Sequence, residues 1–188
     1  MHPKILEIRT VYEGWAKVSI ARVQGANGQI FERLMEDHGR GVCVLPYDPE
    51  RKLAMLVRQF RAPVCAVLAQ TDLVEAVAGL TDGEEPEGAI LREAFEETGL
   101  RLGKLDHVGT VWTMPGISTE RMDMFLAAYR ESDRVGPGGG KDNEHESISV
   151  EEIPLPALAA AADAGKLEDM KTLALVQTLR LREPKLFC

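Results

Sequence analysis

The stretch Glu75–Leu100, EAVAGLTDGEEPEGAILREAFEETGL, decides how the chain folds. Apolar residues of its second half recur at spacings of three and four: Ile90, Leu91, Ala94 and Phe95. This period indicates a helix over 84–98 with one apolar stripe. Gly99 stands where a helix commonly ends in a left-handed C-cap.

Three carboxylates share the other side of this helix. Glu93, Glu96 and Glu97 stand at i, i+3 and i+4, so they fall on one face, where like charges repel. Hard divalent cations need such a concentration of oxygen ligands, and Mg²⁺ typically binds a few carboxylates plus phosphate oxygens of a substrate. Arg92 stands where a bidentate contact would orient a carboxylate. The spacing therefore favours a metal site, and the alternative is a solvated acidic face.

The rest of the chain predicts an α+β domain. Residues alternate as in β-strands over 4–12, 15–23, 30–36, 41–47, 53–60, 105–114, 121–129 and 148–153. Helices are expected over 156–164 and 167–181. A polar, glycine-rich segment at 131–146 is either a functional lid with glycine hinges or a disordered excursion. This order of elements predicts a mixed sheet covered by helices on both sides.

Composition excludes several classes of protein. The 188 residues suffice for one full-sized core, and a net charge of −8 argues against nucleic acid as the partner. Three cysteines without a CxxC pair argue against zinc knuckles and disulfide frameworks, so a reducing cytoplasm is expected. No apolar run approaches the ~18 residues of a membrane span, so no membrane partner is expected.

A family resemblance covers the opening stretch. It rests on Gly79, Glu84, Arg92, Glu93, Glu96, Glu97, Gly99 and Leu100. These residues resemble the Nudix box, G-x5-E-x7-R-E-U-x-E-E-x-G-U, with Ala94 in the aliphatic slot. The interval from Gly79 to Glu84 is one residue shorter than usual. The resemblance implies a Nudix fold, a mixed sheet sandwiched between helices with an N-terminal antiparallel strand extension, and a hydrolase.

Further segments look like one branch of that family. They are Arg58–Arg61, Ala78–Leu80, Met114–Gly116 and the late acidic loop. They are similar to the GDP-mannose and ADP-ribose pyrophosphatases, and most similar to bacterial GDP-mannose hydrolases. The branch implies hydrolysis of the diphosphate of a nucleoside diphosphate sugar with two to three Mg²⁺ ions, or Mn²⁺ instead. Glu32 and Leu34 replace a basic and an acidic residue of the GDP-mannose group, so the preferred base stays open.

The resemblance also implies roles for single residues. The metal ligands are the Ala78 carbonyl, Glu93, Glu97 and Glu146, and the catalytic residues are Glu146 or Glu144 as base, with Glu96 and Arg92. Expected substrate-binding residues are Trp15, Arg33, Arg61, Gly79, Leu80, Glu120 and Lys171. Trp15 and Arg33 correspond to a region that the partner subunit of a dimer supplies. Any single arginine, lysine or tryptophan has an ordinary surface or core role as its alternative.

Two domains and a homodimer follow from the same resemblance. Residues 1–40 are expected to form a dimer-forming β extension and residues 41–188 the hydrolase domain. The main alternative function is a catalytically weak Nudix-fold sensor of a nucleotide sugar. A third reading is an enzyme that removes free nucleoside triphosphates or dinucleoside polyphosphates.

Overall fold

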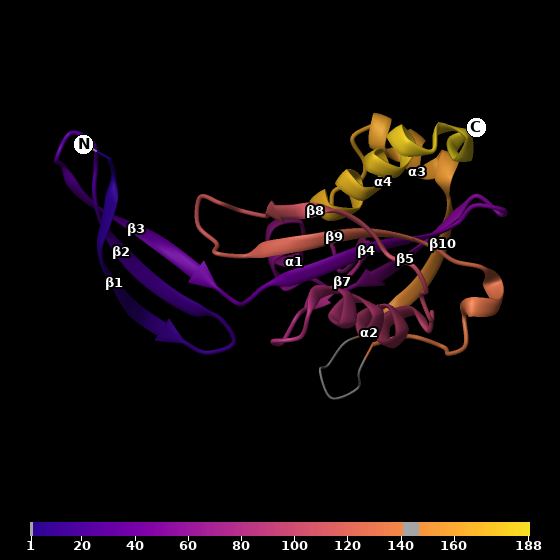
Figure 1. Ribbon diagram of the computed structural model, residues 1–188, viewed down its shortest axis with the longest axis horizontal. Coiled ribbons are helices and arrows are strands. Elements are labelled where there is room, and N and C mark those ends of the chain that lie inside the picture. The colour runs from indigo at the N-terminus through magenta and orange to yellow at the C-terminus, as the bar shows by residue number, and fades with distance from the viewer. Residues whose placement is uncertain (1, 141–146) are drawn as a thin grey trace. The chain divides into compact units, whose positions relative to one another are not determined.

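The computed structural model describes residues 2–140 and 147–188, and Figure 1 shows their elements. The chain forms two compact units. Unit 1 comprises Met1–Gly41 with Thr110–Met122, and unit 2 comprises Val42–Gly109 with Asp123–Cys188. No helix within the described residues is long and apolar enough to cross a membrane.

Unit 1 is built on a three-stranded antiparallel sheet, drawn in indigo and violet in Figure 1. Its strands are β1 (Lys4–Glu13), β2 (Lys17–Gln24) and β3 (Ile30–Asp37), which confirms the three strands expected there. β2 begins two residues later than expected because the turn extends to Ala16, whose carbonyl accepts from the Gly14 amide at 3.1 Å.

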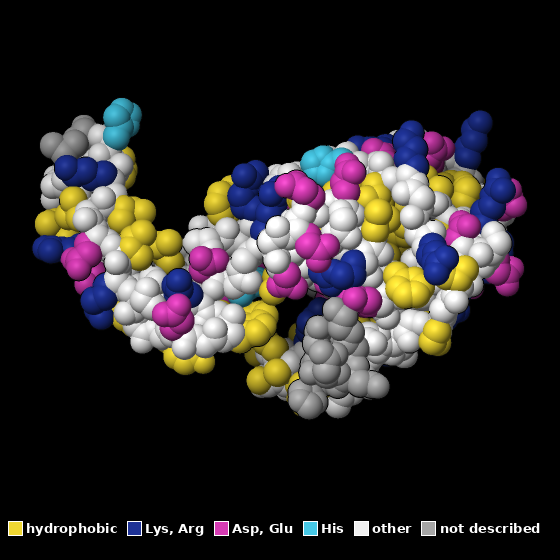
Figure 2. Space-filling model, turned by 60° about the horizontal axis from the view of Figure 1, so that its bottom comes forward, with side chains coloured by type: hydrophobic (Ala, Val, Ile, Leu, Met, Phe, Trp, Pro, Cys, Tyr) yellow, Lys and Arg dark blue, Asp and Glu magenta, His cyan; other side chains and the backbone are white. Residues whose placement is uncertain are grey.

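Large apolar side chains are exposed on this sheet, and Figure 2 shows hydrophobic side chains gathered at its surface. They include Ile5, Leu6, Ile8, Val11, Tyr12, Ile30, Phe31 and Leu34. The distant segment Thr110–Met122 joins the unit through backbone hydrogen bonds. Glu36 donates to the Ile117 carbonyl at 2.8 Å, and Thr119 donates to the Glu36 carbonyl at 2.9 Å.

A seven-stranded sheet has the order β10-β5-β4-β9-β8, with β6 paired to β5 and β7 to β4. Its strands are β4 (Gly41–Asp48), β5 (Leu53–Gln59), β6 (Leu73–Glu75), β7 (Val77–Leu80), β8 (Asp106–Trp112), β9 (Arg121–Ala128) and β10 (Ser149–Pro154). β4 and β5 pair next to the turn between them, at Tyr47–Ala54 and Asp48–Leu53. Beyond the turn the two strands diverge, so β7 and β6 find room to pair with them.

Helices cover both faces of this sheet in unit 2, with α2 on one face and α3 and α4 on the other (Figure 1). The helices are α1 (Ala62–Leu68), α2 (Pro86–Thr98), α3 (Leu155–Asp163) and α4 (Met170–Arg182), with short 3-10 turns η1 (Glu131–Asp133) and η3 (Pro184–Phe187). α2 begins at a proline, which suits the first helical position. The layers confirm the expected α+β sandwich.

The apolar stripe of α2 is narrower than its sequence suggests. Ile90 and Ala94 are completely buried in the main core, but Phe95 is 43% exposed. Its ring lies 5.8 Å from the Arg101 guanidinium carbon, a cation–π contact at the surface. Gly99 has the expected left-handed conformation, with φ 74°.

Candidate active site

Arg92 organises the carboxylate face of α2. Its Nε donates to Glu84 at 2.9 Å, and its Nη1 donates to Glu93 at 2.8 Å and to Glu96 at 3.1 Å. Its Nη2 donates to the Leu80 carbonyl at 3.3 Å. Burial opposes the charge on Arg92, but the surrounding carboxylates raise its pKa above the ordinary value. A permanent cation therefore holds these acidic side chains in place between β7 and α2.

The box carboxylates are not a solvated face, contrary to the alternative considered above. Glu97 is only 2% exposed, and the side chains of Glu93 and Glu96 are 14% and 21% exposed. Gly79 makes part of this burial possible. A Cβ at Gly79 would stand 2.2 Å from the Glu93 Cδ atom, so a glycine is what allows Glu93 to lie against β7.

The chemistry of these donors suits a hard divalent cation. Glu93, Glu96 and Glu97 offer carboxylate oxygens, and Ala78 on β7 offers a backbone carbonyl, as Mg²⁺ prefers. Within residues 2–140 and 147–188, no three acidic, histidine or cysteine side chains form a complete metal-binding group. The remaining expected ligand, Glu146, and the alternative base, Glu144, lie outside the described residues.

The described part of the glycine-rich segment, Gly136–Gly140, lies against the end of α2. Gly136 donates to the Gly99 carbonyl at 3.2 Å, Gly139 to Glu97 at 2.8 Å and Gly140 to Glu96 at 3.1 Å. A Cβ at Gly138 would stand 2.4 Å from the Glu97 carbonyl oxygen. These glycines therefore permit a close backbone approach, and their role as hinges stays a prediction.

Two expected substrate-binding cations meet at a buried carboxylate in unit 2. Arg61 donates to Glu75 through Nε at 2.7 Å and through Nη2 at 3.1 Å, and the Lys171 ammonium donates to the same carboxylate. Glu75 was not predicted from the sequence. The available signal was a single acidic residue inside the apolar run Leu73–Val77, where a charge needs a specific partner.

A second cluster in unit 1 joins two other expected residues through His38. The Trp15 ring stacks on the His38 ring at 5.3 Å between centroids, with 13° between the planes. His38 pairs with Glu36 through Nδ1 at 2.5 Å and with Glu120 through Nε2 at 3.2 Å. Thr113 donates to Glu120 at 2.5 Å. Trp15 is 79% exposed, so one face of its ring is open to a ligand.

Arg33 does not join that cluster. Its Nη1 donates to the Glu32 carbonyl at 3.0 Å, and its guanidinium carbon lies 4.4 Å from the centroid of the Phe31 ring. The guanidinium is therefore held over an exposed aromatic ring of β3.

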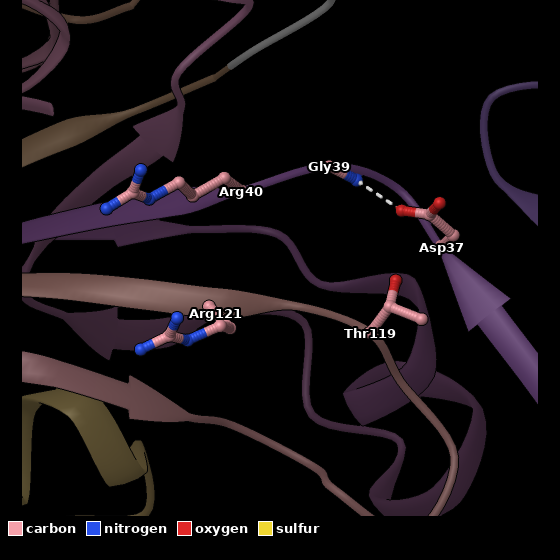
Figure 3. Close-up of a pocket in the computed structure, with 5 residues that line it drawn as sticks. All are labelled: Asp37, Gly39, Arg40, Thr119 and Arg121. Carbon is pink, nitrogen blue, oxygen red and sulfur yellow. Dashed lines mark hydrogen bonds between the residues drawn. The ribbon is translucent and has the colours of Figure 1, made fainter. Parts of the chain in front are cut away.

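Two surface hollows lie apart from the expected site residues. The first, of about 370 Å³, is lined by Asp37, Gly39, Arg40, Thr119 and Arg121 of unit 1. Figure 3 shows the Arg40 and Arg121 side chains extending in the same direction, away from the Asp37–Gly39 hydrogen bond. The second, in unit 2, is lined by Glu85, Pro86, Glu87, His107, Asp123 and Phe125. No residue in the expected set lines either hollow.

Comparison with known proteins decides the family. The model of the NUDIX domain matches residues 37–170. The chain belongs to the NUDIX family. The match confirms the family resemblance, the Nudix fold and the expected class of enzyme, a Nudix hydrolase. Nudix hydrolases generally need a divalent metal such as Mg²⁺.

Curated relatives match most of the chain. A GDP-mannose pyrophosphatase of Cronobacter sakazakii is 40% identical over 153 residues, which are 80% of this chain and 78% of the relative. A GDP-mannose pyrophosphatase of Salmonella arizonae is 38% identical over 159 residues, 82% of each chain. A crystal structure of an ADP compounds hydrolase matches 98% of this chain and 96% of its own, with a TM-score of 0.77. At 19% identity, that likeness concerns the fold alone.

Proposed function

We propose that this Nudix hydrolase cleaves the diphosphate bond of a nucleoside diphosphate sugar, GDP-mannose or ADP-ribose, to a nucleoside monophosphate and a sugar phosphate. The observation that carries the proposal is the carboxylate face of α2, where Arg92 holds Glu93 and Glu96 beside the buried Glu97. Two relatives with about four-fifths of the chain in common are named GDP-mannose pyrophosphatases.

The proposed metal ligands are Glu93, Glu97, the Ala78 carbonyl and Glu146. Two to three Mg²⁺ ions, or Mn²⁺ in their place, would neutralise the diphosphate and lower the pKa of an attacking water when bound. Arg92 would keep Glu93 and Glu96 oriented. This arrangement is supported by the hard oxygen donors of α2 and β7 and by the overall acidity of the chain, which otherwise repels a phosphate.

Hydrolysis itself balances with one water. The water oxygen forms a bond to one phosphorus, the bridging P–O bond breaks, and the sugar phosphate or nucleotide leaves with the bridging oxygen. The proton of the water would pass to Glu146, with Glu144 as the alternative base. The amide of Gly140 donates to Glu96 on α2, which supports recruiting a base from the sequence that follows Gly140.

Several residues are proposed to recognise the substrate. Arg61 and Lys171 would bind phosphate or sugar oxygens, and the backbone at Gly79 and Leu80 would line the diphosphate site. Trp15 would stack on the base, with Glu120 as a polar contact. Residues 1–40 would form a β extension that is separate from the hydrolase domain at 41–188. The protein would form a homodimer through this extension, so the partner subunit would supply Trp15 and Arg33.

The exposed apolar side chains of the three-stranded sheet support this dimer, since large exposed apolar patches commonly mark protein interfaces. A cytoplasmic location is proposed with it. Among the described residues, Cys65 and Cys188 form no disulfide bond, as a reducing compartment favours.

The test is a panel of possible substrates with Mg²⁺: GDP-mannose, ADP-ribose, ADP-glucose, UDP-glucose, NADH and dGTP. Chromatography should detect a nucleoside monophosphate and a sugar phosphate in equal amounts from one sugar nucleotide, and chelation with EDTA should stop their release. Preferred hydrolysis of dGTP would contradict the proposed substrate class. Binding of a sugar nucleotide with no turnover would instead identify a sensor.

A further inference from the structure

The carboxylate of Glu75 lies between two cations that come from different elements. Its side chain is 3% exposed at the end of β6. Arg61, the residue before α1, contacts both carboxylate oxygens, and Lys171, in the first turn of α4, contacts one of them. A buried charge is costly unless it is paired and hydrogen-bonded, so the three side chains constrain one another.

The backbone beside Glu75 is fixed to the start of α4. The amide of Ala76 donates to Thr172 Oγ1 at 2.6 Å, and this hydroxyl donates to Asp169 at 2.5 Å. Asp169 also caps α4 by accepting from the Thr172 amide at 3.0 Å, and it accepts from Lys171 at 2.9 Å. The distance between Glu75 and Lys171 is therefore set by a network and not by one flexible contact.

Both cations keep donors that Glu75 does not use. Within the described residues, the Arg61 contacts with Glu75 use Nε and Nη2, which leaves the Nη1 edge of the guanidinium, and the Arg61 side chain is 42% exposed. Lys171 has three N–H groups, of which Glu75 and Asp169 take two. The four side chains carry two positive and two negative charges, so the cluster offers oriented donors without a net charge.

Electrostatics connects this cluster to α2. Burial opposes the charge on Arg61, but Glu75 and then Glu97 raise its pKa above the ordinary value. Burial would also raise the pKa of Glu75, yet Arg61 and Lys171 hold it below the ordinary value, so Glu75 is ionised.

We propose that Glu75 is a positioning residue that fixes Arg61 and Lys171 as one two-cation receptor for the phosphate oxygens of the substrate. The inference deepens the proposed function and rests on it, since it takes a diphosphate as the ligand. Glu75 acts only through the two cations and does not touch the substrate. Its contribution is orientation, because guanidinium and ammonium donors held in advance bind phosphate without first losing their freedom.

The first test is Glu75→Asp in the full chain, which keeps the charge but withdraws the carboxylate by one methylene. The KM for the hydrolysed sugar nucleotide should rise about tenfold while kcat stays within about threefold, because binding is lost and the chemistry on α2 is not. A melting curve like that of the wild type excludes general unfolding. An unchanged KM would overturn the proposal.

The second test compares two variants that change the charge of the protein equally. Glu75→Gln and Asp163→Asn each add one positive charge, and Asp163 pairs with Arg180 outside the cluster. If orientation matters, Glu75→Gln raises KM although the cluster becomes more positive, whereas Asp163→Asn leaves KM unchanged. Equal behaviour of the two variants would contradict the positioning role. If Glu75→Gln does not fold, Glu75→Asp decides.

A failure of the proposed hydrolysis can be distinguished from a failure of the two-cation receptor. In that case the wild-type protein hydrolyses no sugar nucleotide, and the receptor is tested by calorimetric binding of inorganic diphosphate. Weaker binding by Glu75→Asp than by the wild type would support the receptor. Equal binding by the two proteins, or no binding by either, would overturn it.

Discussion

Single charged residues in this protein are held by several partners each. Arg92 contacts Glu84, Glu93 and Glu96, while Glu75 contacts Arg61 and Lys171. Such multiple pairing costs less than leaving a buried charge with one partner, and it fixes side-chain direction. Holding charged side chains in fixed directions is the property that most directly serves phosphate chemistry.

The ion pairs of His38 predict a stability of unit 1 that depends on pH. Burial alone would lower its pKa, but hydrogen bonds and charges of Glu36 and Glu120 raise it above the ordinary value of 6.5. A raised pKa means that these pairs stabilise unit 1 fully below about pH 6.5. That contribution is lost as the pH rises through the pKa of the folded protein.

Proton NMR of the His38 ring measures this directly, with the signal assigned from the spectrum of His38→Gln. We expect a pKa above 6.5 in the wild type and a lower pKa in Glu120→Gln, which keeps the shape of the partner without its charge. A wild-type pKa at or below 6.5 would show that the two carboxylates do not hold the imidazolium.

Helices and strands that are long enough to show a regular spacing of apolar residues could be predicted from the sequence. α2 and the strands β1 to β3 are long enough for their alternation to show, and Gly99 marks the end of α2 by its left-handed conformation. α1, β6 and β7 were not predicted, because three to seven residues hold too little period to distinguish them from a loop. The consequence is that Glu75, at the end of β6, was missed.

Contacts between distant residues set a second limit on prediction. Glu75 and Lys171 are 96 positions apart, and neither residue contains a local signal of the other. The carboxylates of α2 could be predicted because their spacing lies within one helix. Trp15 and Glu120 were expected only from the family resemblance, and their common neighbour His38 was not expected at all.

The contact between Gly136–Gly140 and α2 leads to a testable prediction. Gly138 has φ +69°, and a Cβ there would stand 2.4 Å from the Glu97 carbonyl oxygen. Gly138→Ala should therefore push the segment away from α2 and cost about 1–3 kcal/mol of stability from the backbone strain alone. The rate of hydrolysis should fall by more than the lost stability explains if the segment helps to supply the base.

Thermal melting and the rate of hydrolysis of one substrate are the measurements. Gly165→Ala is the matched control, because Gly165 also has a left-handed φ, of +66°, but a Cβ there meets no atom within 4 Å. If both variants lose the same stability and keep the same activity, docking of the segment does not serve catalysis.

The whole molecule is predicted to be a homodimer. The apolar residues exposed on the three-stranded sheet are the reason, since burying them in a second copy of the chain removes apolar surface from water. Light scattering should give twice the mass of one 20.7 kDa chain. A monomer at micromolar concentration would contradict the dimer and the proposed supply of Trp15 and Arg33 by a partner subunit.

We propose that the carboxylate face of α2 performs metal-dependent hydrolysis. Its most direct test compares kcat with Mg²⁺ for Glu97→Gln and for Glu87→Gln, which removes an exposed carboxylate from the first turn of the same helix. We predict that Glu97→Gln loses about 100-fold or more of kcat while both variants melt cooperatively, and that Glu87→Gln keeps nearly the full rate. A Glu97→Gln protein that retains the wild-type kcat would contradict this role of the carboxylate face.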